Sequence, residues 1–182
     1  GKPIVMVLFT GRPLALQSEE KQVNAILNVW FGGTEAGAAI ADVLTGKVSP
    51  TGKLTMSFPR VTGQCPIYYN HKMTGRPMSP DAWYTRYVSN YIDVLNEPLY
   101  PFGYGLSYTT YTYGDVSLNT NSMDANGKIQ ASVIVTNTGA QDGEEIVQLY
   151  LRDIVRSITP PVQELKGFKR VALKAGESKK VT

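Results

Sequence analysis

Residues 25–47 read AILNVWFGGTEAGAAIADVLTGK, and this stretch predicts a buried strand followed directly by a helix. The apolar run at residues 25–31 has the length and composition of a strand buried on both faces. The glycine pair at 32–33 allows a tight turn, and after Thr34 the apolar residues recur at helical spacing. Thr34 can cap this helix, and Gly46 can end it in a left-handed conformation. A strand, a turn and a helix in this order are typical of an α/β layer.

The neighbouring segments extend the α/β pattern in both directions. Residues 3–9, PIVMVLF, are a continuous apolar run that predicts a second strand buried on both faces. The charged residues just before residue 25 predict a short helix that leads into the strand already described. Residues 52–58, GKLTMSF, predict a further strand that stops at Pro59. Because strands and helices alternate, residues 1–60 are expected to form an α/β layer with parallel strand pairing.

The last seventy residues show the alternating period of strands. Residues 128–139 and 144–153 alternate between two faces, and 168–173 and 177–182 are shorter segments of the same kind. Turns rich in glycine and asparagine separate these segments, and no helical pattern interrupts them. About five strands of this kind predict an antiparallel β-sandwich, which would need two more strands beyond Thr182 to reach seven.

Composition limits the classes of function. The chain has 182 residues, of which 42% are hydrophobic and 18% charged, so we expect a globular, soluble protein. No apolar run approaches the roughly 18 residues of a membrane span, and the 18 lysines and arginines are scattered, which argues against a nucleic-acid partner. Cys65 is the only cysteine and His71 the only histidine, so we expect no intrachain disulfide and no metal site. Both ends run directly into strand patterns, without a signal peptide, as expected of a piece of a larger polypeptide.

Two glycine-rich stretches are similar to nucleotide-binding motifs but do not match them. In GKVSPTGKL, Gly52 lies six positions after Gly46 where a P-loop requires five, and Leu54 replaces the magnesium-binding Ser or Thr. The stretch GGTEAG lacks the full dinucleotide fingerprint and does not follow the first strand. The sequence therefore predicts no nucleotide cofactor, and no other cofactor is expected.

Six stretches, taken in order along almost the whole chain, resemble glycoside hydrolase family 3, especially its bacterial β-glucosidases of periplasmic type. The stretches are GKPIVMVLFTGRPLAL, AILNVWFGGTEAGAAIADVLTGKVSPTGKLTMSFPR, YYNHKMTGRP, EPLYPFGYGLSYTTY, VTNTGAQDGEEIVQLYLRD and ELKGFKRVALKAGES. The resemblance implies a (β/α)8 barrel, an α/β sandwich domain and a fibronectin type III-like domain in the full-length protein. It implies a fold class of α/β plus all-β for this chain. Residues 1–60 would be the second half of the α/β sandwich domain, 61–106 the linker and domain joint, and 107–182 the fibronectin type III-like β-sandwich without its last strands.

Within the expected joint, residues 96–108 read NEPLYPFGYGLSY and place three aromatics at alternate positions. Pro98 and Pro101 restrict the backbone to extended conformations, and the aromatic rings can bury a large area. We interpret this stretch as a rigid connection between the two domains. The alternative is an aromatic platform that stacks on a sugar.

The resemblance implies a hydrolase of carbohydrate metabolism, a retaining β-glucosidase that removes terminal non-reducing β-D-glucosyl residues. Its nucleophile Asp would lie on the barrel and its acid/base Glu on a loop upstream of this chain, so we expect no catalytic residue here and no activity of the chain alone. The pairs Glu19–Glu20 and Glu144–Glu145 are interpreted as solvated charges. The alternative function is a non-catalytic carbohydrate-binding or adhesion module, and the sequence leaves both glucose and xylose open as the sugar.

A long segment, residues 68–98, offers the one expected contribution to substrate binding. It contains five tyrosines, one tryptophan and three cations besides His71, and long loops in compact domains are often functional. Arg76 and Tyr87 match positions expected to bind the leaving group of the substrate, at a site that can belong to a neighbouring subunit of a homodimer. The alternative is that Arg76 pairs with an acid and Tyr87 packs in the domain joint. The expected partners are the substrate and the rest of the polypeptide, and the expected location is periplasmic or secreted.

Overall fold

The computed structural model describes residues 1–79, 84–155 and 157–182, and the chain divides into two compact units. Unit 1 comprises Gly1–Ala41, Lys53–Tyr104 and Tyr150–Lys166, and unit 2 comprises Asp42–Gly52, Gly105–Leu149 and Gly167–Thr182. Within the described residues, no helix has the length and apolarity needed to cross a membrane.

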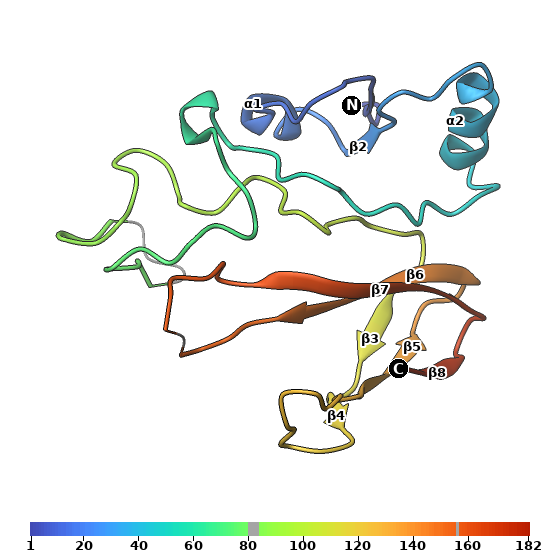
Figure 1. Ribbon diagram of the computed structural model, residues 1–182. Helices are drawn as coiled ribbons and strands as arrows, with labels where there is room; N and C mark the ends of the chain where they lie inside the picture. Colours follow the sequence, from blue (N-terminus) through green and yellow to red (C-terminus); the bar gives the residue numbers. More distant parts are fainter. Residues whose placement is uncertain (80–83, 156) are drawn as a thin grey trace. The chain divides into compact units, whose positions relative to one another are not determined.

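The predicted parallel strands form the start of unit 1 (Figure 1). Strand β1 (Val5–Leu8) pairs in parallel with β2 (Ala25–Asn28), and the short helix α1 (Gln17–Glu20) lies between them in sequence. This arrangement confirms the strand, helix and strand predicted from the apolar runs. None of the residues in these two strands is fully buried. Parallel sheets are normally covered on both faces, so this pair lacks the cover that its sequence predicts.

Helix α2 (Ala36–Leu44) forms where the helical spacing predicts it. Gly46 adopts the expected left-handed conformation, with φ of 77°, and its N–H donates to the Val43 carbonyl at 2.9 Å. Lys47 forms an exposed ion pair of 3.0 Å with Asp42. No residue of α2 is fully buried, so its apolar face is only partly covered by the described residues.

The strand predicted over residues 52–58 is not formed. This segment is extended but joins its partner, the stretch at 96–108, by separate hydrogen bonds, with an isolated antiparallel bridge between Phe58 and Tyr100. Two further bonds of 2.7 Å hold the backbone of Leu54 to the same stretch. A continuous ladder does not form because the Tyr104 N–H closes a turn on the Pro101 carbonyl at 3.1 Å, and the Phe102 N–H donates to the Ser57 hydroxyl at 3.2 Å instead of to a backbone carbonyl.

Three aromatic rings of the 96–108 stretch, those of Tyr100, Phe102 and Tyr104, pack within unit 1. Tyr100 stacks on Tyr104 with 5.3 Å between ring centroids, and its edge meets the buried ring of Phe58. Phe102 stacks on Tyr69 at 4.2 Å. Burial raises the pKa of the Tyr100 hydroxyl. These contacts make the stretch rigid, and its predicted role as a joint between domains remains a prediction.

The C-terminal part of the chain forms six strands, where the sequence predicts about five. Strands β3, β4 and β8 each pair antiparallel with β5, and β6 pairs with β7 (Figure 1). The bounds are β3 (Tyr111–Tyr113), β4 (Ser117–Leu118), β5 (Ala131–Asn137), β6 (Gly143–Leu151), β7 (Glu164–Leu173) and β8 (Ser178–Val181). The core of unit 2 gathers one or two apolar residues from each of β5 to β8, namely Val135, Val147, Val171, Leu173 and Val181.

The neighbouring residues Glu144 and Glu145 in β6 have different surroundings. Glu144 reaches solvent, as predicted, and it also forms an ion pair with Arg170 at 3.3 Å. Glu145, predicted to be solvated, is instead buried and accepts a 2.9 Å hydrogen bond from the Tyr113 hydroxyl. Burial, followed by this hydrogen bond, raises the pKa of Tyr113. Neighbouring residues on a strand point to opposite faces, so only one of the two glutamates can reach solvent.

Asn137, at the end of β5, is 0% exposed and has a partner for every hydrogen-bonding group of its side chain. Its Oδ1 accepts from the Thr109 hydroxyl at 2.6 Å and from the Gly139 N–H at 3.1 Å. Its Nδ2 donates to the carbonyls of Gln141 at 2.8 Å and Leu173 at 3.2 Å. This one side chain therefore connects β5, β7 and the turn between β5 and β6.

Candidate functional site

The tyrosine-rich segment, residues 68–98, contains no helix and no multi-residue strand among its described residues, yet its backbone is closed by specific bonds. The Ser89 N–H donates to the Arg76 carbonyl at 2.8 Å, and an isolated bridge joins Pro77 to Ser89. The chain between these residues is therefore a loop whose two ends meet. The tryptophan of this segment, Trp83, lies outside the described residues.

Amide side chains hold the second half of this loop. The Nδ2 of Asn90 donates to the carbonyls of Thr85 and Val88 at 2.9 and 3.0 Å. The Nδ2 of Asn96 donates to the Ser89 carbonyl at 2.9 Å. Asparagine side chains commonly replace backbone partners in irregular segments, and here they fix the chain on both sides of residue 87.

Gln64 connects the tyrosine-rich segment to the rest of unit 1. Its side chain is almost completely buried; Nε2 donates to the Leu95 carbonyl at 2.8 Å, and Oε1 accepts from the Arg60 N–H at 2.5 Å. The Tyr91 hydroxyl donates to the Gln64 carbonyl at 3.2 Å. Sequence analysis missed this positioning role, because one glutamine in the short 3-10 helix Thr62–Gln64 gives no local signal.

The structure leaves both predicted binding residues, Arg76 and Tyr87, exposed to solvent. Tyr87 is 81% exposed, so its ring is not packed into a joint among the described residues, and no described acid forms an ion pair with Arg76. Tyr87 also has a φ of 67°, which is uncommon for a bulky residue and is seen most often at functional sites. An arginine offers several hydrogen-bond donors in a fixed fork, and an exposed tyrosine offers a flat ring face.

A pocket of about 380 Å³ lies in unit 1 beside the start of the tyrosine-rich segment. Its walls include the stacked rings of Tyr69 and Phe102, together with Met56 and Ile67, and no charged residue lines it. Cys65 is exposed and lies at this pocket. The walls come from four separate parts of the sequence, which is why no local pattern predicts the pocket.

None of the residues that line the pocket is a carboxylate. Glu19 lies in the exposed helix α1, where a hydrogen bond from Ser18 lowers the pKa of its carboxyl group. Among the described residues, no group of three His, Cys, Asp or Glu side chains is arranged to hold a metal ion. What the segment offers is binding chemistry, namely hydrogen-bond donors and aromatic faces.

Comparison with known families assigns both parts of the chain. Residues 1–108 match the family described as Glycosyl hydrolase family 3 C-terminal domain, and residues 145–182 match the Fibronectin type III-like domain. All 182 residues align at 55% identity with a periplasmic beta-glucosidase of Salmonella typhimurium, and at 46% identity with a beta-xylosidase of Formosa agariphila. In each case the chain covers 24% of the relative, so it spans about a quarter of the length of the curated relatives that it matches.

Solved structures give the same result. The crystal structure of a beta-glucosidase from Listeria innocua in complex with glucose matches all of this chain at a TM-score of 0.94 and 48% identity. A mutant of that enzyme in complex with laminaribiose matches at a TM-score of 0.93. In both comparisons the chain covers 25% of the solved chain.

Proposed function

The chain belongs to glycosyl hydrolase family 3, and on this basis we propose that it is the C-terminal part of a retaining β-glucosidase. The whole enzyme would hydrolyse terminal non-reducing β-D-glucosyl residues. The observation that carries the proposal is the full-length match of this chain to the C-terminal part of β-glucosidases, at up to 55% identity among the relatives described above. A free-standing carbohydrate-binding or adhesion module is disfavoured, because residues 1–108 match a glycosyl hydrolase domain.

The proposed architecture divides the chain at residues 60 and 106. Residues 1–60 would be the second half of an α/β sandwich domain, 61–106 the linker and domain joint, and 107–182 a fibronectin type III-like β-sandwich that lacks its last strands. The uncovered faces of β1, β2 and α2 support the first part, because parallel strands are normally covered on both sides. The proposed β-sandwich at residues 107–182 is supported by its core, because the pair β5–β8 and the pair β6–β7 both contribute buried apolar side chains to it.

The catalytic carboxylates would lie in the preceding part of the polypeptide, so the isolated chain would not hydrolyse glucosides. A direct test is to assay the purified chain on nitrophenyl β-glucoside beside the full-length enzyme. Turnover by the chain that survives repurification would contradict the placement of the catalytic groups. Inactivity of the full-length enzyme on every β-glucoside tested would contradict the proposed activity itself.

Arg76 and Tyr87 would bind the leaving-group sugar of a disaccharide substrate. Both are exposed, they lie on a loop closed at Ser89, and Tyr87 has a strained backbone, which supports a binding role. The guanidinium would donate hydrogen bonds to sugar hydroxyls, and the phenol ring would stack on a sugar face. Neither would contact the glucosyl unit that is transferred.

The test compares two substrates in the full-length enzyme. Arg76→Ala and Tyr87→Ala should each lower kcat/KM for laminaribiose by about tenfold or more, equivalent to roughly 1.4 kcal/mol of transition-state stabilisation. Nitrophenyl β-glucoside should lose much less, because its leaving group has no sugar hydroxyls. Matched controls are Arg86→Ala and Tyr84→Ala, which replace exposed residues of the same segment. Both control variants should leave kcat/KM for the two substrates unchanged. Equal losses on both substrates would contradict the assignment.

A β-xylosidase is the second candidate function, because a Formosa agariphila beta-xylosidase aligns along the whole chain at 46% identity. Nitrophenyl β-xyloside, assayed beside the glucoside, separates the two activities. The periplasmic name of the Salmonella relative supports a periplasmic location for the enzyme. We also propose a homodimer, which sedimentation of the full-length enzyme would test.

A further inference from the structure

The turn that carries Tyr87 has an unusual backbone for a bulky residue. The chain turns at residues 86 and 87, and Tyr87 has a φ of 67°. Turns that need a positive φ at their third residue normally have Gly or Asn there. A tyrosine disfavours this conformation because its Cβ crowds the backbone, so the turn depends on other contacts that hold it.

A side chain closes this turn in place of the backbone. In the described part of the chain, no backbone hydrogen bond joins Thr85 to Val88. Instead, the Nδ2 of Asn90 donates to the carbonyls of Thr85 and Val88, at 2.9 and 3.0 Å. Both N–H groups of one amide are therefore used on the two ends of the turn, and Tyr87 lies between those ends.

Asn90 is itself held from both sides. The Nδ2 of Asn96 donates to the Ser89 carbonyl at 2.9 Å, and its Oδ1 accepts from the Tyr91 N–H at 3.1 Å. The Ser89 N–H donates in turn to the Arg76 carbonyl at 2.8 Å. The residues before and after Asn90 are thus tied to the base of the loop, so the Asn90 amide reaches the turn from a fixed backbone.

The oxygen of the Asn90 amide shows which part of this side chain matters. Its Oδ1 is buried and has no hydrogen-bond partner among the described residues, which is unfavourable for a polar atom. An apolar side chain would avoid this loss, and an aspartate would place a second acceptor against two carbonyl oxygens. The N–H donors are therefore what an amide contributes at this position.

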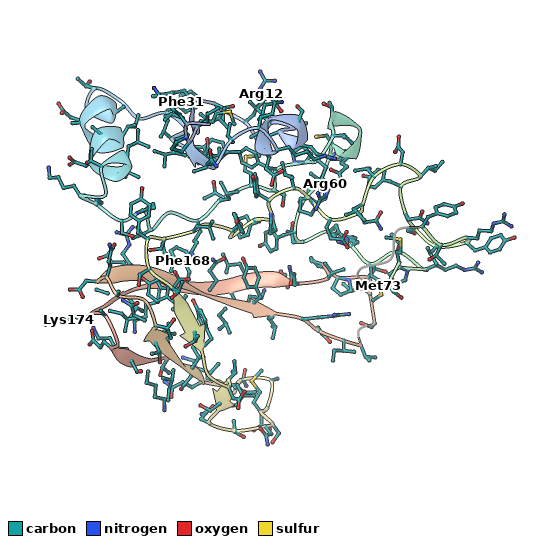
Figure 2. The ribbon with its side chains drawn as sticks, turned by 180° about the vertical axis from the view of Figure 1, so that it is seen from behind. Arg12, Phe31, Arg60, Met73, Phe168 and Lys174 are labelled. Carbon is teal, nitrogen blue, oxygen red and sulfur yellow. The ribbon has the colours of Figure 1, made fainter. Side chains whose placement is uncertain are left out.

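The direction of the Tyr87 ring depends on this turn. The ring is 81% exposed, so little packing holds it, and the loop that carries it projects from the rest of unit 1 (Figure 2). A side chain that is ordered only when a ligand binds lowers the affinity, because its ordering costs entropy. A turn that is fixed in advance avoids part of that cost and presents the ring face to a ligand.

We propose that Asn90 is a positioning residue for Tyr87: its amide fixes the turn at residues 85–88 and so presents the ring to the leaving-group sugar. This rests on the proposed function above, in which Tyr87 stacks on that sugar. Asn90 does not contact the substrate and acts through Tyr87. It therefore favours substrates whose leaving group is a sugar, and it has little effect on aryl-glucosides.

The experiment compares two substrates in the full-length enzyme. Asn90→Ala should lower kcat/KM for laminaribiose by about fivefold or more, whereas kcat/KM for nitrophenyl β-glucoside should stay within about twofold. Asn90→Asp keeps the size of the side chain but not its N–H donors, so it should show an equal or larger selective loss. Asn126→Ala, which replaces an exposed asparagine of unit 2, is the matched control and should change neither value. Equal losses on both substrates, or full activity of Asn90→Asp, would overturn the proposal.

A double-mutant cycle separates positioning of Tyr87 from a general structural role. In a Tyr87→Ala background, Asn90→Ala should change kcat/KM for laminaribiose by less than about twofold, because the ring that it positions is absent. A loss in that background as large as in the unsubstituted enzyme would overturn the proposal. Melting temperatures are measured on the same samples. If Asn90→Ala does not fold, Asn90→Ser, whose hydroxyl can donate one of the two bonds, takes its place in the cycle with the same criteria.

The single variant Tyr87→Ala distinguishes this proposal from the function on which it rests. If Tyr87→Ala selectively impairs laminaribiose and Asn90→Ala does not, the positioning role is overturned and the binding role of Tyr87 stands. If Tyr87→Ala has no selective effect, both roles are overturned, and turnover of nitrophenyl β-glucoside shows whether the β-glucosidase activity itself stands.

Discussion

Replacing Asn137 with alanine removes four hydrogen bonds at a position that is 0% exposed. Two of the partners that lose their bond, the Thr109 hydroxyl and the Leu173 carbonyl, are themselves buried, and a buried polar group without a partner costs about 1–3 kcal/mol. The other two partners, Gly139 and Gln141, lie in a turn that water can reach, so they lose only the net value of about 0.5–1.5 kcal/mol each. We therefore expect Asn137→Ala to destabilise the strands around β5 by at least about 3 kcal/mol, which is the sum of the lower limits.

Native-state hydrogen exchange of the full-length enzyme measures this loss locally. Because about 1.4 kcal/mol corresponds to a factor of ten, protection of peptides from β5 and β7 should fall by at least about two orders of magnitude. Asn119→Ala is the matched control: Asn119 is exposed and its Oδ1 accepts one bond, from the Gln130 N–H at 2.7 Å, so water can replace it. A loss of less than tenfold for Asn137→Ala, or the same loss for both variants, would refute the reasoning.

Three further substitutions test the fold. The raised pKa of Tyr113 means that its neutral form is stabilised in the folded state, so stability should fall as the pH rises above about 10; Tyr113→Phe should flatten that decline in a series of melting temperatures. Gly143→Ala should destabilise unit 2, because its methyl group would overlap the Tyr111 hydroxyl, whereas Gly63→Ala, where nothing lies within 4 Å, should show no such loss. Phe102→Ala should lower the stability of unit 1 by less than the roughly 3–5 kcal/mol of a fully buried ring, because Phe102 is only partly buried where it stacks on Tyr69; a raised KM at an unchanged melting temperature would favour the sugar-platform alternative.

Local sequence patterns were sufficient for the elements whose signals lie within a few residues. The apolar run before Gly32 predicts β2, the helical spacing after Thr34 predicts α2, and the left-handed Gly46 at its end is confirmed. These features follow from backbone geometry and from the period of apolar residues, which depend on neighbours in the sequence. The family resemblance likewise rests on ordered motifs, and the comparisons confirm it.

The candidate site was predicted only in part, because sequence patterns report mainly on residues that are neighbours in the chain. The sequence indicates a tyrosine-rich segment with Arg76 and Tyr87, but not the buried Gln64 that anchors it, because the partner carbonyl of Leu95 is thirty-one residues away. The binding role of the two exposed residues remains a prediction. The pocket beside the start of the tyrosine-rich segment forms only when separate parts of the chain meet, so no single stretch of sequence reveals it.

Tertiary contacts decided the features that depend on residues far apart in the sequence. Residues 52–58 have the composition of a strand, yet they form none, because the stretch that packs beside them turns at Pro101–Tyr104 and its Phe102 N–H donates to the Ser57 hydroxyl. The sequence by itself determined where helices and strands can form, since that requires only a period and a turn. The tertiary structure decided that Glu145 is buried and that the Phe31 ring lies against Gly11. Burial and close packing depend on groups that strand register brings together.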